Sequence, residues 1–524
     1  MAKLHYRGNL SAAIFPMSLA DAGRTVINPQ YDQNFDRRVD PAGEQKTVGI
    51  PQAIFMENVI PTVAGYQSVG YNIRNSMPPE SGSTGVITVI DCFQVADVDA
   101  GRILILARNG TVSSYADVVS TNIGASISWQ YATGNIPSGT RHYTAFVRGT
   151  HYWFDGTDLF SYTINPTTKQ ITFTDISGSV TGITPTDIKC ITSSYNYLIA
   201  LMNDGSIAWS STTTPTDFTP SLVTGAGSET PSGAQGANFL KEHPSGFYIY
   251  CDNSIVFAQY TGNARYPWKF VPVADSGGYS SPYQAFGGYN IGVQYGIDNS
   301  NKLQIIEGNK ASLVGGEIST FLERKKNKDV FDYSTNTFSK INGFVQKAIS
   351  FVLDRYIFVS ISFGTSNAYT HIFVYDVLLQ RYGILKKDHT FTVSDDQGIT
   401  LIPTSPTQAV YAVSFDVYDS QATIQGVLLL GKFQFVRDKA LQLQEVIFEC
   451  GRDPDLATQN IEILDYQTDD GKTFLPPVAL PLTTSTELLK ADCFLTAKNH
   501  SILLKGAFDI NTIELVARVA GERT

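Results

Sequence analysis

The chain has 524 residues, so burying it requires several domains or one large repeating architecture. Hydrophobic residues make up 43% and aromatic residues 12%, but charged residues only 16%, which is the balance of a β-rich protein with a hydroxyl-bearing surface. A formal net charge of -10 argues against a protein that binds nucleic acid through counterion release, because that mode needs clustered Lys and Arg.

Residues 1–85 show little regular pattern and are rich in Pro, Gly and Asn. We expect an extended N-terminal arm and assembly segment that becomes ordered against other surfaces. Pro16, Ser18 and Asp21 interrupt the mildly apolar residues 12–22, so a cleaved signal peptide is not expected. No run approaches the ~18 apolar residues of a membrane span. The sequence therefore predicts a protein without a membrane-spanning segment.

A hairpin pattern then recurs along the chain: an aromatic and β-branched strand, a turn with Asn or Asp, and a second strand. The turn residues are Asn109, Asp155, Asp204, Asp252 and Asp298, which are 46, 49, 48 and 46 residues apart. Repeats of roughly 40 to 50 residues with four strands each have the size of β-propeller blades. The period therefore predicts an all-β fold built around a propeller.

The spacing lengthens after Asp298, where a charged insertion spans residues 321–336 before two further hairpin-like units. Counting these units gives about seven blades, with six and eight as alternatives. We assign residues 86–438 to the propeller, including the inserted loop. A propeller of this size has an axis too narrow for a double helix, so any duplex-sized channel is expected between copies of the chain.

The insertion contains a basic cluster, Arg324, Lys325, Lys326 and Lys328. This cluster is a candidate interaction patch for phosphate, lipid or an acidic partner. The flanking Glu323 and Asp329 favour the simpler interpretation of a solvated face.

From residue 439 to residue 524 the pattern changes to longer strands separated by a Pro-rich segment, which predicts a C-terminal β-sandwich-like domain. This region contains QTDDGKTF (Gln467–Phe474), which resembles the Asp box of sialidases but departs from it at the first and last positions. Such boxes are hairpin turns rather than active sites, so this one predicts a turn.

No motif in the chain specifies chemistry. The cysteines are widely spaced and odd in number, which favours buried thiols over disulfides or a zinc knuckle; they are Cys92, Cys190, Cys251, Cys450 and Cys493. The histidines show no HExxH pattern and are expected to be ordinary structural residues; they are His5, His142, His151, His243, His371, His389 and His500. TGAGSET (Thr224–Thr230) lacks the P-loop lysine, and no GxSxG elbow is present. We expect no catalytic residues, metal or cofactor.

Three segments resemble the tail nozzle proteins of short-tailed bacteriophages (podoviruses), also called DNA-stabilisation or tail hub proteins. The first segment is MENVIPTVAGYQSVGY (Met56–Tyr71), the second is GSIAWSSTTTPTDFTPS (Gly205–Ser221), and the third is IYCDNSIVFAQYTGNARYPWKFVPVADSGGYSSP (Ile249–Pro282). Their order and spacing are also similar to those of the family.

This resemblance implies a structural virion protein that forms a homohexameric tube at the distal end of the tail. Such a tube contacts the portal and adaptor proteins, offers attachment surfaces for fibres or a spike, and retains packaged DNA. Duplex DNA then passes through it during ejection without sequence-specific binding. The resemblance implies location in the virion tail after synthesis in the host cytoplasm, and no enzymatic activity.

Two other functions stay open. One is a receptor-binding propeller that recognises a surface sugar by aromatic stacking without cleavage. The other is a propeller glycosidase, which would need a convergent pair of carboxylates in a central pocket.

Overall fold

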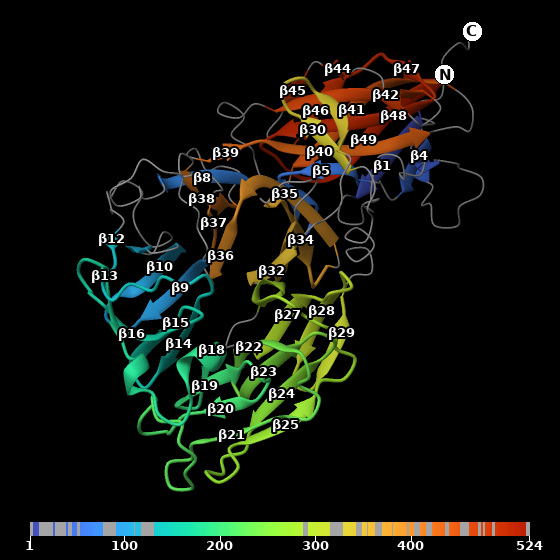
Figure 1. Cartoon of the computed structure of the whole chain (residues 1–524). Helices are drawn as coiled ribbons and strands as arrows, with labels where there is room; N and C mark the ends of the chain where they lie inside the picture. Colours follow the sequence, from blue (N-terminus) through green and yellow to red (C-terminus); the bar gives the residue numbers. More distant parts are fainter. Residues whose placement is uncertain are drawn as a thin grey trace.

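The computed structural model of the chain consists of a β-propeller joined to a β-sandwich (Figure 1). The only other regular elements among the described residues are short 3₁₀ helices, including η2 (Ser177–Ser179), η3 (Pro185–Asp187) and η4 (Pro282–Gln284). The structure describes residues 4–9, 25–26, 38–39, 45–49, 53–76, 91–108, 111–116, 130–286, 292–314, 328–341, 348–353, 355–361, 369–379, 381–395, 398–402, 409–415, 422–434, 440–450, 461–469, 473–474, 477–480, 482–484 and 488–519.

The first five blades follow one another along the chain as separate antiparallel sheets. The first blade contains β9 (Asp91–Asp97), β10 (Gly101–Arg108), β11 (Thr111–Ala116) and β12 (Gln130–Tyr131), and the second contains β14 (Tyr143–Val147), β15 (Thr150–Phe154), β16 (Leu159–Ile164) and β17 (Ile171–Asp175), with β13 (Thr133–Gly134) parallel to β17. The third blade contains β18 (Ile188–Ser194), β19 (Tyr197–Met202), β20 (Ile207–Trp209) and β21 (Gly227–Glu229), and the fourth contains β22 (Ala237–His243), β23 (Gly246–Cys251), β24 (Ile255–Tyr260) and β25 (Trp268–Pro272). The fifth blade contains β26 (Ala285–Phe286), β27 (Val293–Ile297), β28 (Leu303–Glu307) and β29 (Lys310–Leu313).

Two further blades complete the ring, and the last one takes a strand from the N-terminal region. The sixth contains β32 (Ala348–Leu353), β33 (Tyr356–Ile361), β34 (Tyr369–Asp376) and β35 (Arg381–His389); the seventh contains β36 (Phe391–Asp395), β37 (Gly398–Ile402), β38 (Ala409–Ser414) and β8 (Gly70–Ser76), with β39 (Thr423–Ile424) on the outer side of β8. The first strand of the seventh blade, β36, contacts β9 of the first. Because β8 precedes β9 in the chain, its pairing with β38 closes the ring with strands from both ends of the propeller sequence.

The period that the sequence suggested has a simple structural basis. Asp155, Asp204, Asp252 and Asp298 each occupy the turn between the second and third strands of a blade, whereas Asn109 lies outside the described residues. The carboxylate accepts hydrogen bonds from backbone amides of its own turn in three of these turns, for example from the amides two and four residues after Asp298 at 2.9 and 2.8 Å. The predicted propeller with about seven blades is confirmed.

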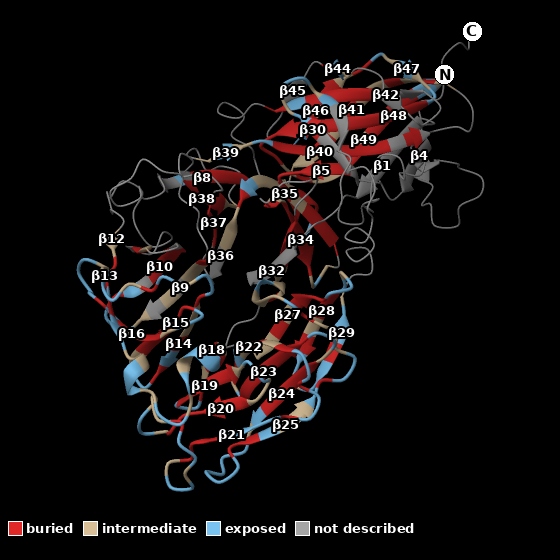
Figure 2. Cartoon of the chain, viewed as in Figure 1, coloured by how far each residue is buried: buried red, intermediate tan, exposed pale blue. Residues whose placement is uncertain are grey.

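The sandwich packs two sheets around one apolar core. One sheet contains β3 (Arg38–Val39), β4 (Gln45–Gly49), β1 (Leu4–Asn9), β49 (Asp509–Val519), β41 (Leu441–Cys450), β46 (Leu488–Asp492), β45 (Leu482–Thr484) and β47 (Thr496–Ala497); the other contains β2 (Thr25–Val26), β5 (Ala53–Glu57), β40 (Gly426–Gln434), β48 (Asn499–Gly506), β42 (Glu462–Asp469), β43 (Thr473–Phe474) and β44 (Val478–Ala479). Figure 2 shows that the buried residues follow the strands of both units, while exposed residues lie mainly in turns.

A continuous hydrogen-bonded sheet connects the two units. β6 (Val59–Pro61) pairs with β35 of the sixth blade, β7 (Tyr66–Ser68) pairs with β6, and β49 of the sandwich pairs with β7. The pairing therefore runs from β32 in the propeller to β3 in the sandwich without a break. We call residues 57–71, which include β6 and β7, the joint segment.

The division of the chain into domains stays a prediction, with bounds at 1–85, 86–438 and 439–524. Strand pairing crosses them at several places; for example, β8 completes a propeller blade and β40 lies between β5 and β48 in the sandwich. A hydrophobic strand such as β40, buried at Val427 to Leu430, carries no signal for which of two adjacent cores it enters.

Candidate functional site

One side chain from each blade meets at the propeller axis. We call this group the axis cluster; in blade order it consists of Asp91, Tyr143, Cys190, Lys241, Tyr283, Tyr369 and Phe391. Tyr283, on η4, donates a hydrogen bond to the Asp91 carboxylate and lies near Tyr143 and Tyr369. Its ring is 5.7 Å from that of Phe391. Through Tyr283, these contacts link side chains of the first, second, sixth and seventh blades across the middle of the ring.

Asp91 is the electrostatic centre of the axis cluster. Its side chain is 6% exposed, and burial raises its pKa from 3.8 to about 7. The amide of Cys92, 2.9 Å away, and the nearby Lys241 oppose this rise by favouring the charged form. Burial also lowers the pKa of Lys241. A carboxyl group that titrates near neutral pH is a candidate acid or base, but a structural carboxyl with poor solvation behaves in the same way.

The cluster does not reproduce the pair of carboxylates that glycoside hydrolysis uses. Among the described residues, the groups that set the pKa of Asp91 include no second carboxylate. Glu242 follows Lys241 in β22, but its carboxylate contacts the hydroxyl of Ser193 at 3.4 Å. The arrangement can bind a polar group through Tyr283, which is 36% exposed, and Asp91.

The joint segment is held from both sides by specific hydrogen bonds. Asn58 accepts from the Tyr71 hydroxyl and from the amide of Lys386, both at 2.8 Å. Arg381, buried in the sixth blade, donates to the carbonyl oxygens of Thr62 and Gly65 and lies over the ring of Tyr66. The propeller is therefore fixed to the joint segment by buried polar contacts as well as by strand pairing.

Gly65 and Gly278 show why two of the resembling segments contain glycine. A Cβ at Gly65 would overlap the carbonyl oxygen of Ile510 in β49, and a Cβ at Gly278 would overlap that of Asp252 in a blade turn. Only a residue without a side chain permits these close backbone approaches. These glycines thus have packing roles.

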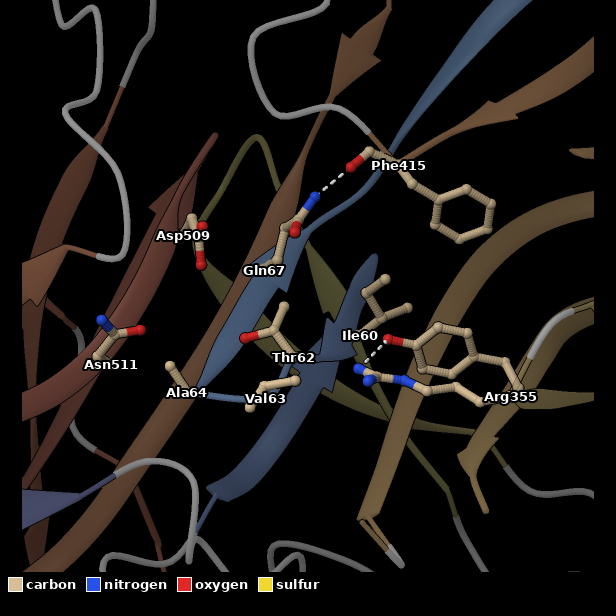
Figure 3. A pocket seen from close by; sticks show the side chains of 10 residues that line it. Ile60, Thr62, Val63, Ala64, Gln67, Arg355, Phe415, Asp509 and Asn511 are labelled. Atoms are coloured by element: carbon tan, nitrogen blue, oxygen red, sulfur yellow. Dashed lines mark hydrogen bonds between the residues drawn. The ribbon is translucent and has the colours of Figure 1, made fainter. Parts of the chain in front are cut away.

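A pocket of about 420 Å³ opens beside the joint segment (Figure 3). Val63 and Ala64 line it from the β6–β7 turn, Asp509 and Asn511 from β49, and Arg355 from the sixth blade. The Nε atom of Arg355 is 3.1 Å from a carboxylate oxygen of the buried Asp376, so its charge is balanced within the protein. The pocket therefore lies between the propeller and the sandwich, and its one cationic lining residue among those described, Arg355, is already paired within the protein.

The structure describes residues 328–336 of the charged insertion, where β30 (Lys328–Asp332) forms a hairpin with the following strand β31 (Thr337–Ile341). Phe331 is buried with Phe55 of the sandwich, and Lys505 donates to Tyr333 and Asn336 at 3.0 and 2.8 Å. The hairpin thus docks on the sandwich.

The predicted basic patch stays a prediction. Arg324, Lys325 and Lys326 lie outside the described residues, as does the side chain of Lys328 at the start of β30.

Three of the histidines singled out in the sequence have structural partners. His142 accepts from the Trp153 indole at 3.0 Å, His151 contacts Asp97 at 3.0 Å, and His500 contacts Asp465 at 3.1 Å in the sandwich core. Within the ranges described above, no three His, Cys, Asp or Glu side chains gather to hold a metal ion.

The two loop motifs and the membrane prediction complete the account. The Asp-box-like segment contains the end of β42 and all of β43, which pair as a hairpin, and the TGAGSET segment contains β21. No helix in the part of the chain that the structure describes has the length and apolarity that a membrane crossing requires.

Sequence comparison finds no matching family model and no matching curated protein. Comparison of structures finds propellers: the WD40 propeller domain of Doa1 is 8% identical over 67% of this chain and 99% of that one, with a TM-score of 0.35. Sqt1 from Saccharomyces cerevisiae is 12% identical over 62% and 83%, with a TM-score of 0.36. BamB from Moraxella catarrhalis is 9% identical over 63% and 98%, with a TM-score of 0.32. The chain is thus a β-propeller protein by its own strand pairing, and these likenesses add nothing about function.

Proposed function

We propose that the chain is the nozzle subunit of a short bacteriophage tail, a structural protein that assembles into a homohexameric tube, retains packaged DNA and lets it pass during ejection. The proposal starts from the resemblance of three segments to podovirus tail nozzle proteins. The observation that supports it best is the continuous sheet from β32 to β3, which makes propeller and sandwich one hydrogen-bonded body. A tube wall under internal pressure needs such a connection rather than a flexible linker.

The axis cluster fits this role in one respect. Because side chains from all seven blades meet on the axis, DNA would pass between copies rather than through one propeller. A net charge of -10 suits a surface along which phosphates slide without being held. The proposal includes no catalytic activity, cofactor or metal.

The test is single-particle imaging of the purified chain, alone and mixed with the portal and adaptor proteins of a short-tailed phage. A six-fold ring with an opening wide enough for duplex DNA, or its addition to the portal–adaptor complex, is the expected result. A monomer that joins neither a ring nor the complex would refute the proposal.

The second candidate function is recognition of a cell-surface saccharide without cleavage. An exposed tyrosine stack on the third and fourth blades favours it and is developed below. Hydrolysis is a separate question: turnover of any substrate in a broad panel of glycans would contradict the non-enzymatic proposal.

A further inference from the structure

The turn between β18 and β19 holds a tyrosine in an unfavourable backbone conformation. Tyr195 and Asn196 have φ angles of 46° and 66°, in the left-handed region. Asn is common there, but a bulky aromatic residue is not, because its Cβ crowds the backbone. Asn or Gly at position 195 would form the same turn with less strain, so the fold alone does not require this tyrosine.

The strained turn places the Tyr195 ring flat against the next blade. Its centroid is 3.9 Å from that of Tyr260, at the end of β24, and the ring planes are 17° apart. Tyr260 is itself supported by Trp268, 5.4 Å away. The Tyr195 residue is nevertheless 43% exposed. The stack therefore fixes the ring from one side and leaves surface available on the other.

Two ordered loops lie on the same end of these blades. The first, residues 210–226, is held where the Trp209 indole donates to the carbonyl of Gly225 at 2.8 Å. The second, residues 261–267, is closed by the amide of Thr261 donating to Pro267 at 2.9 Å. A Cβ built on Gly225 would lie 3.5 Å from the carbonyl of Ala264, so the two loops are adjacent.

Large side chains on these loops are turned to solvent. Tyr266 is 62% exposed, Leu222 is 68% exposed and Val223 is 93% exposed. The guanidinium of Arg265 lies 5.4 Å from the centre of the Tyr266 ring. The surface thus combines the stacked Tyr195 ring, the exposed Tyr266 ring and a multiple hydrogen-bond donor, Arg265.

We infer that Tyr195 is a stacking platform for a pyranose ring of a cell-surface polysaccharide. The apolar C–H face of a pyranose matches an aromatic face, and a ring already held by Tyr260 loses little conformational freedom on binding. Arg265 supplies donors for ring hydroxyls or a uronate. The inference deepens the second candidate function and does not rest on the tail role.

A lipid surface is the competing partner, because Leu222 and Val223 project from a loop tip. The observations favour the saccharide, since strain is stored at the tyrosine and not at the two aliphatic residues. The two partners differ in which side chains they need.

The experiment measures binding of the full chain to immobilised polysaccharides: delipidated O-chains, capsular polysaccharides, dextran and a β-glucan. The key variant is Tyr195→Asn, which suits the turn and is expected to keep the fold. The matched control is Phe494→Asn, which removes an exposed aromatic residue from the sandwich. We expect one polysaccharide to bind, Tyr195→Asn to weaken binding at least tenfold, and the control to bind like the unchanged chain.

Three results would overturn the inference. They are no binding to any polysaccharide, unchanged binding by Tyr195→Asn, and binding only to vesicles of anionic phospholipid that is lost in the Leu222→Asp, Val223→Asp double variant. Thermal melting of Tyr195→Asn checks its fold. Ring formation is measured separately by imaging. If the platform is wrong, polysaccharide binding fails whatever imaging shows, and if the tail role is wrong, imaging shows no ring whatever the binding assay shows.

Discussion

Replacing Asp91 with Asn tests the electrostatics of the axis cluster. Burial raises the pKa of Asp91 from 3.8 to about 7, so the folded chain binds this proton more tightly than the unfolded chain. Stability from this group is full below pH 3.8 and is lost as the pH rises to about 7. A change of this size corresponds to about 4 kcal/mol, at about 1.4 kcal/mol per tenfold change in proton affinity.

Asp91→Asn removes the charge but keeps an oxygen that accepts from Tyr283 and from the Cys92 amide. At pH 8 we expect the variant to be more stable than the unchanged chain by about 2 to 4 kcal/mol, with the difference shrinking towards zero at pH 4. Urea midpoints followed by the fluorescence of the 4 tryptophans provide the measurement. Asp99→Asn, at an exposed turn of the same blade, is the control.

The reasoning would be refuted if Asp91→Asn destabilised the chain more at pH 8 than at pH 4. That sign would mean that folding lowers the pKa of Asp91, because attraction to Lys241 exceeds the cost of burial.

Three substitutions test the packing assignments. Gly65→Ala should lower the free energy of unfolding by about 3 kcal/mol or more, because the new Cβ would meet backbone atoms. Gly178→Ala, where no atom lies within 4 Å of the new Cβ, should change it by less than about 1 kcal/mol, and thermal melting compares the two variants. Arg381→Met should cost about 2 to 4 kcal/mol by leaving two carbonyls without their donor, whereas Lys490→Met at an exposed ion pair should cost under about 1 kcal/mol in the same assay. Asp298→Ala removes the acceptor for two turn amides and should lower the free energy of unfolding by about 1 to 2 kcal/mol, measured by urea unfolding. An unchanged free energy would show that these hydrogen bonds do not stabilise the fold.

The sequence predicted the repeating part of the fold because its signal is local. An Asp that accepts from its own turn amides marks each turn independently of the rest of the chain, so the period survives in one sequence. The ring closure was not predicted, because β8 and β38 pair across more than three hundred residues and neither sequence contains a local signal that specifies its pairing partner or register. The same holds for β6, whose place beside β35 depends on tertiary contacts.

The axis cluster was also missed, for a related reason. Its members come one from each blade, and no single residue type marks them: three are tyrosines, but Asp91, Cys190 and Lys241 have different chemistry. Alignment of the blades by their turn aspartates would not have found them either, because Tyr283 lies on η4 and Tyr369 on β34 rather than at one common strand position. The raised pKa of Asp91 depends on burial, which single-sequence patterns do not report.

The glycines of the resembling segments and Tyr195 differ in what explains them, and this difference bears on function. Gly65 and Gly278 permit backbone approaches that no other residue allows, so their presence is explained by packing. Such residues are what a rigid structural part needs, and they indicate no chemistry. Tyr195, which lies just before the second segment, is different: its conformation costs energy that Asn or Gly would avoid. The chain therefore pairs a framework determined by packing with one strained, exposed aromatic residue, and recognition by the propeller is best sought at that residue.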